Sequence, residues 1–188
     1  MLDIALKFLQ DELNAYLFTR TGSDTVKVEM SRLVDEAGKY ALEGETIGAT
    51  IINLEEDRIF KSHLPEHSYL NGQHIVQEPD LKLNLHVLFA ANFKLYDQAL
   101  KYLSYILLFF QAHSVFTSEK YPGLDPNIGQ LTIELQSLNY EQLNQVWAFI
   151  GGKHLPSVIY KVRMVILQDM EPQKVQRPLT TININLHH

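Results

Sequence analysis

The N-terminal segment carries apolar residues at the spacing of an amphipathic helix. Over residues 2–18, leucines and other apolar residues recur at steps of three and four, which places them in one stripe along a helix of 3.6 residues per turn. Charged side chains fall on the opposite side, and "RTGSD" then interrupts the pattern. This segment therefore predicts a helix that packs on a core through its leucine face.

Several later segments alternate apolar and polar residues with a period of two, as half-buried β-strands do. The clearest is "DLKLNLHVLFAAN", in which Leu81, Leu83, Leu85, Val87 and Phe89 form the apolar side. The other predicted strands are "VKVEM", "TIGATIINLEE", "QLTIELQSL" and "SVIYKVRMVIL". From residue 56 to 78 the chain is polar and aperiodic, which predicts a long loop or a hairpin excursion.

A second helix is predicted at residues 94–112. Its expected buried stripe consists of Tyr96, Ala99, Leu100, Leu103, Ile106, Leu107 and Phe110. Tyr105, Leu108 and Phe109 fall off that stripe, so the C-terminal half of this helix is apolar nearly all round. Such a helix is buried on several sides. These three residues therefore pack either on other elements of the same subunit or on a neighbouring one, and they are our candidates for contact with a partner.

A third helix is predicted to begin after Asn139, because Gln142 follows three residues later as in a capping box, and to end at Gly151. Its apolar residues are Tyr140, Val146, Trp147, Phe149 and Ile150. They are interpreted either as anchors of an interface or, for most of them, as the face that packs on the sheet.

The C-terminal residues 171–188 contain Pro172 and Pro178, which prevent a helix from running through them. In "TTININL", Ile182, Ile184 and Leu186 alternate with asparagines, as in a strand. An unpaired strand edge attracts a partner, which is this subunit's own sheet, the sheet of a neighbouring copy or a different protein. We favour exchange between subunits, with these three residues in contact with the partner. The alternative is a disordered chain end.

The predicted order is α-β-β-loop-β-α-β-α-β. It indicates an α+β fold with helices packed on a mainly antiparallel or mixed β-sheet. A chain of 188 residues suits one domain, which we assign to residues 1–170, followed by an extended arm over residues 171–188.

Composition excludes several classes of function. The chain has no cysteine, so disulfides and thiolate chemistry are absent. Its formal net charge of −6 argues against nucleic-acid binding, which requires a basic surface. The apolar run from Leu103 to Phe110 is too short to span a bilayer, which takes about 20 residues, so we expect no membrane association.

No motif nominates an active site. His63 and His67 have the four-residue spacing of helical metal ligands, but Pro65 lies between them and no acidic residue at ligand spacing completes a set with His74. Nucleophile-elbow and phosphate-loop motifs are also absent. We therefore expect no catalytic residues, no bound metal and no cofactor, and we do not expect an enzyme.

Two long blocks resemble a known family. "LNLHVLFAANFKLYDQALKYLSYILLFFQAHSVFT" and "LNYEQLNQVWAFIGGKHLPSVIYKVRMVIL" resemble the cap, or tail-terminator, proteins of phage-tail-like extracellular contractile injection systems of the antifeeding-prophage and virulence-cassette types. "DIALKFLQDELNAYLFTRTG" and "TIGATIINLEEDRIF" match the same pattern in order, so the resemblance covers about residues 1–170.

The resemblance implies a tail-terminator-like fold and a structural protein. Such a cap forms a hexameric ring on the end of the inner tube and stops growth of tube and sheath, so its partners are further copies, the inner tube protein and the sheath protein. Assembly in the cytoplasm would precede incorporation into a released or cell-associated particle. The alternatives are a monomeric binding module or, less favoured by the residues, a small metal-dependent enzyme.

Overall fold

The computed structural model describes residues 1–57, 66–70, 73–77, 81–166 and 175–176. Three helices occur in this part of the chain: α1 (Leu2–Thr21), α2 (Tyr96–Ala112) and α3 (Tyr140–Ile150). They lie close to the three predicted positions. The expected α+β fold is confirmed.

The centre of the molecule is a six-stranded sheet with the order β1-β2-β5-β8-β7-β6. Its strands are β1 (Val28–Met30), β2 (Thr46–Glu56), β5 (Leu81–Asn92), β6 (Val115–Phe116), β7 (Ile128–Gln136) and β8 (Ser157–Ile166). Among these described strands, only β1 and β2 pair in parallel, and all other neighbours are antiparallel. The sheet is therefore mixed, as predicted, and β6 is a two-residue edge strand that no sequence pattern indicates.

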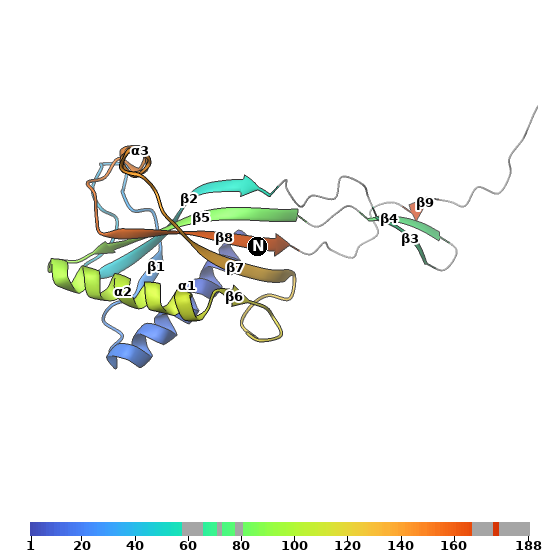
Figure 1. Ribbon diagram of the computed structural model, residues 1–188, viewed down its shortest axis with the longest axis horizontal. Helices are drawn as coiled ribbons and strands as arrows, with labels where there is room; N and C mark the ends of the chain where they lie inside the picture. Colours follow the sequence, from blue (N-terminus) through green and yellow to red (C-terminus); the bar gives the residue numbers. More distant parts are fainter. Residues whose placement is uncertain (58–65, 71–72, 78–80, 167–174, 177–188) are drawn as a thin grey trace, which may run out of the picture.

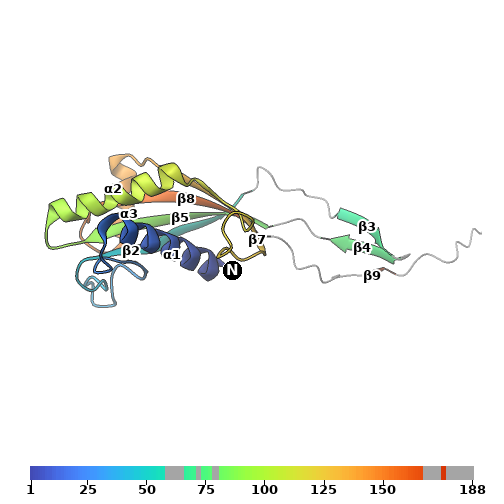
Figure 2. The same ribbon diagram turned by 90° about the horizontal axis from the view of Figure 1, so that it is seen from below.

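The helices cover both faces of the sheet, with α1 and α2 on one face and α3 on the other (Figures 1 and 2). The strand residues show this division directly. Val87 and Phe89 of β5 are buried in the main core with residues of α1 and α2. Leu88 and Ala90, which alternate with them, are buried in a second core with Trp147 of α3.

Local signals explain where α3 begins and ends. The Asn139 side chain accepts a hydrogen bond from the Gln142 N–H at 2.8 Å, and the Gln142 side chain accepts one from the Asn139 N–H at 3.0 Å. This is the predicted capping box. Gly151 ends the helix in the left-handed region at φ 78°, which glycine adopts without steric cost.

Between β1 and β2 the chain crosses to the α3 face and covers the second core with Leu33 and Leu42, which are both buried. It lies close to the sheet because residue 48 is glycine. A Cβ atom on Gly48 would come within 2.6 Å of Leu33 Cδ2 and 2.9 Å of Leu42 Cδ1. The absence of a side chain at this position therefore determines how residues 31–45 pack.

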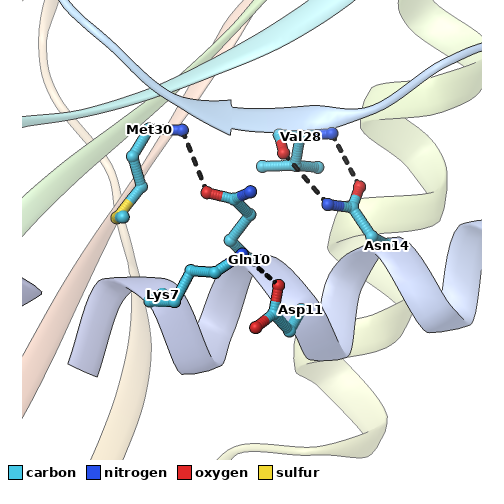
Figure 3. A network of polar contacts seen from close by, with 6 residues as sticks. All are labelled: Lys7, Gln10, Asp11, Asn14, Val28 and Met30. Atoms are coloured by element: carbon cyan, nitrogen blue, oxygen red, sulfur yellow. Dashed lines mark hydrogen bonds and ion pairs between the residues drawn. The ribbon is translucent and has the colours of Figure 1, made fainter. Parts of the chain in front are cut away.

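The first strand is held by the first helix. Asn14 of α1 donates to the Val28 carbonyl at 3.1 Å and accepts from the Val28 N–H at 2.8 Å (Figure 3). The Gln10 side chain accepts a hydrogen bond from the Met30 N–H at 3.2 Å. β1 is an edge strand, so its outer backbone groups have no neighbouring strand to bind. The Asn14 and Gln10 side chains provide their hydrogen-bond partners instead.

A second sheet consists of β3 (Glu66–Leu70), β4 (Gln73–Gln77) and β9 (Val175–Gln176), in the order β3-β4-β9 (Figure 1). The predicted excursion therefore contains a hairpin. The end of β2 pairs with the start of β5, and the start of β5 pairs with the end of β8. The chain thus leaves β2, enters β5 and leaves β8 at one end of the main sheet, and the small sheet repeats the order β2-β5-β8.

Candidate functional site

The buried face of α2 differs from the predicted stripe. Its buried residues are Ala99, Tyr102, Leu103, Ile106, Phe109 and Phe110. Leu103, Ile106 and Phe110 are thus buried as predicted, while Leu107 is half-buried. Tyr96 and Leu100 are exposed at 67% and 45%, so their assignment to the buried stripe is wrong.

Phe109 is a core residue, and this corrects its selection as a residue available to a partner. Its ring centroid lies 5.1 Å from that of Tyr16 in α1 and 6.2 Å from that of Phe116. The cause is that α2 contacts α1 as well as the sheet. A second neighbour widens the buried face of a helix beyond the stripe that a single contact requires.

The exposed side of α2 carries an apolar row, which we call the α2 outer face: Tyr96, Leu100, Ser104 and Leu108. Leu100 and Leu108 are 45% and 49% exposed and lie about two helical turns apart. Between them, the Ser104 hydroxyl donates to the Leu100 carbonyl at 2.8 Å, so it is satisfied inside the helix. Tyr105 packs partly against the main core beside this row.

The opposite face of the sheet carries a groove of about 500 Å³ between α3 and the strands. It is lined by Ile52, Asn53, His86, Leu138, Gln142, Gln145, Val146, Phe149 and Ile159. The Phe149 side chain at this groove is 81% exposed. Trp147 is buried on the sheet, as expected for most of the apolar residues of α3, whereas Tyr140 is 93% exposed.

A smaller hollow of about 220 Å³ lies alongside β2. It is lined by Arg32, Leu33, Val34, Thr50, Ile51, Ile52, Phe149 and Ile150. Ile52 and Phe149 border both this hollow and the groove. The sequence pattern does not indicate the hollow, because it is formed by residues that are distant in the chain.

The titratable side chains on this face lie in separate pairs rather than in one cluster. His86 Nε2 lies 3.6 Å from a Glu55 carboxylate oxygen, and an Arg163 nitrogen lies 3.3 Å from a Glu134 carboxylate oxygen across β7 and β8. Within the described residues, no group of three or more His, Asp or Glu side chains is placed to hold a metal ion. The described helices include none that is long and apolar enough to cross a membrane.

Several predicted residues lie outside this description. His63, Ile182, Ile184 and Leu186 are outside the described residues, so the predicted partner contacts of the arm stay a prediction. His67 and His74 lie in β3 and β4, whose backbone alone is described. The division of the chain at residue 170 is likewise still a prediction.

Comparison with known families identifies the chain. The family model of the Pvc16 N-terminal domain matches residues 5–181, nearly the whole length. The chain belongs to the Pvc16 N-terminal domain family. This assignment confirms the resemblance to tail terminators, and no curated protein matches the sequence.

Solved structures agree with the Pvc16 assignment at the level of the fold. The sheath/tube terminator of an extracellular contractile injection system, PVC, in the extended state has a TM-score of 0.67 at 13% identity, and all of this chain covers 64% of that one. The tube-terminating cap of the anti-feeding prophage has a TM-score of 0.60 at 12% identity, and 95% of this chain covers 60% of it. The chain therefore spans about three-fifths of the length of these two proteins. Both are structural proteins rather than enzymes.

Proposed function

We propose that this protein is the cap, or tail terminator, of a contractile injection particle. Six copies form a ring on the end of the inner tube, and the ring contacts tube and sheath so that neither grows further. Family membership supports this role, as does a fold shared with a sheath/tube terminator and a tube-terminating cap. Assembly takes place in the cytoplasm, before the particle is complete.

The observation that carries the proposal is the pair of exposed apolar surfaces on opposite faces of the sheet. The α2 outer face presents Leu100 and Leu108, and the α3 side presents Phe149. A closed ring needs a heterologous interface, in which one patch of a subunit meets a different patch of the next. Two separate surfaces on opposite faces supply that arrangement, whereas a self-complementary dimer needs only one.

The mass of the purified protein in solution tests the ring, measured by light scattering with and without the tube protein of the same particle. We expect a six-copy species, formed alone or on the tube end. The double variant Leu100→Glu/Leu108→Glu is expected to abolish it, because charge on an apolar contact is costly to bury. The change Phe18→Glu in α1, at a side chain that is 55% exposed, serves as the control.

The outcome separates the proposal from its alternatives. A strict monomer at high concentration, with or without tube protein, would favour a monomeric binding module that uses the groove beside Phe149. One metal ion bound per chain would favour a metal-dependent enzyme. A six-copy species that persists in the double variant would show that the ring does not use the α2 outer face.

A further inference from the structure

The outer edge of β2 is only partly covered. β1 pairs with β2 over three residues, with Met30 opposite Ala49. The ladder ends where the Ser31 N–H donates to the Ala49 carbonyl at 3.2 Å. Beyond this point the chain turns towards the α3 face, and no described strand pairs with the outer side of β2 from Thr50 onward.

The backbone groups of this open edge point outward. The Ile47 N–H donates to the Lys27 carbonyl on the β1 side at 2.9 Å. Every second residue of a strand directs its backbone groups to the same side, so those of Ile51 also face outward. The pairing of β2 with β5 is irregular between Ile51 and Asn53. Beyond this irregularity, the Leu54 N–H donates a hydrogen bond to the Asn53 side-chain oxygen at 2.9 Å.

The hollow beside this edge has a partly apolar wall. Val34 lines it from the segment that leaves β1, together with Arg32, and Ile52 and Phe149 line it from β2 and α3. An added strand presents alternate side chains to such a wall while its backbone pairs with the edge. The required sequence therefore has apolar residues at every second position and no positive charge, which Arg32 would repel.

The chain contains one such sequence beyond the described residues. In residues 180–186, Ile182, Ile184 and Leu186 alternate with Asn183 and Asn185, and none of the seven residues is charged. Extended, this segment measures about 23 Å. It is long enough to pair along β2 from Thr50 to Leu54.

Strand order favours a tail from another copy. β9 lies beside β4, on the side of the small sheet that corresponds to β8 of the main sheet, whereas the β2 side corresponds to β3. The tail of one chain therefore leaves the small sheet from the strand that follows β8 rather than from the strand that follows β2. In a head-to-tail ring, the next copy brings a different surface to this edge.

We propose that residues 180–186 of one copy add as a strand to the outer edge of β2, over Thr50–Leu54, in a second copy. Ile182, Ile184 and Leu186 then contact the wall formed by Val34, Ile52 and Phe149. This inference rests on the proposed ring for its geometry. It assigns to the ring an exchange of strands between neighbouring copies.

Cysteine cross-linking tests the exchange, because the native chain has no cysteine and any disulfide must join introduced residues. Thr50 lines the hollow and Asn53 lines the groove, so both side chains lie on the α3 side of β2, where Ile184 is expected. Full-length Thr50→Cys or Asn53→Cys protein is mixed with full-length Ile184→Cys protein during assembly and oxidised.

We expect a disulfide between the two different chains from at least one of these mixtures, with the better position reporting the register. No cross-link in either mixture would overturn the exchange. A cross-link that forms only when both cysteines are in one chain would also overturn it, because the tail would then pair with its own β2.

Matched variants test the residues that make the contact. Phe149→Ala is expected to lower the cross-link yield about tenfold, as for loss of an interface anchor. Tyr140→Ala, a change at another exposed aromatic of α3, is expected to leave it unchanged. Within the tail, Ile182→Asp should abolish the cross-link and Asn183→Asp should keep it. Equal yields within either pair would refute the proposed face.

The mass of the assembly distinguishes this inference from the proposed function. A six-copy ring without the cross-link leaves the cap proposal standing and refutes the strand exchange. Cross-linked chains that never close into a ring support the exchange and refute the ring.

Discussion

Asn14 of α1 binds both backbone groups of Val28 in β1, as a neighbouring strand would. We predict that Asn14→Ala lowers the free energy of unfolding by about 2–3 kcal/mol. The change removes two hydrogen bonds from the backbone of Val28, which is buried. Gln10→Ala removes the single bond to Met30 and should cost about 1 kcal/mol. Urea denaturation measures both, and equal losses would contradict the double role of Asn14.

Phe110 joins α2 to the centre of the sheet. Its ring centroid lies 4.7 Å from that of Tyr160 and 5.7 Å from that of Phe89, and its side chain is buried. Phe110→Ala is expected to cost about 3–5 kcal/mol, as for other large core truncations. Leu108→Ala on the same helix should change the melting temperature little, and a near-zero shift for Phe110→Ala would disprove its place in the core.

Alkaline pH tests the burial of Tyr160, which raises the pKa of its phenol to about 12. An unfolded tyrosine loses its proton near pH 10, its ordinary pKa. Between these values the unfolded chain binds fewer protons than the folded one. The contribution of this group to stability is therefore complete below about pH 10 and is lost as the pH rises towards about 12. The loss amounts to at most about 2–3 kcal/mol.

Denaturation curves recorded from neutral to strongly alkaline pH provide the measurement. Tyr160→Phe should remove this part of the alkaline loss, whereas Tyr140→Phe at an exposed site should not. An identical pH profile for wild type and Tyr160→Phe would show that another group controls the alkaline transition.

The close approach at Gly48 predicts a specific steric effect. Gly48→Ala should destabilise the protein by about 1–3 kcal/mol, because its Cβ overlaps Leu33 and Leu42 in a packed core. Gly123→Ala, where the added Cβ would meet its nearest atom at 3.7 Å, is the control and should be nearly neutral. In a Leu33→Ala background the effect of Gly48→Ala should shrink, since residues in contact are not additive. If the effects of Gly48→Ala and Leu33→Ala were fully additive, the destabilisation by Gly48→Ala would not arise from contact with Leu33.

Elements that depend on a local pattern of residues are predictable from the sequence. Strand β5 can be recognised from alternation because Leu85, Val87 and Phe89 face the same core. The capping box at Asn139 can be recognised because it depends on four consecutive residues. The α+β class follows from patterns of the same local kind.

Other features depend on contacts between distant segments and leave no local pattern. Phe109 is buried because α1 lies beside α2, and neither helix alone encodes that neighbour. The second core forms because residues 31–45 pass to the α3 face, where Leu33 and Leu42 are buried. Gly48 leaves room for these two side chains. A glycine in a strand does not by itself reveal which distant side chains pack on it. The hollow at β2 arises in the same way, because Phe149 reaches it from α3.

The repeated strand order in the two sheets has a mechanical consequence. A force applied to the small sheet enters the main sheet through β2, β5 and β8 together, since the chain joins all three to it at one end of the main sheet. Three adjacent strands at the centre of the fold thus share any load that the small sheet passes to the main one.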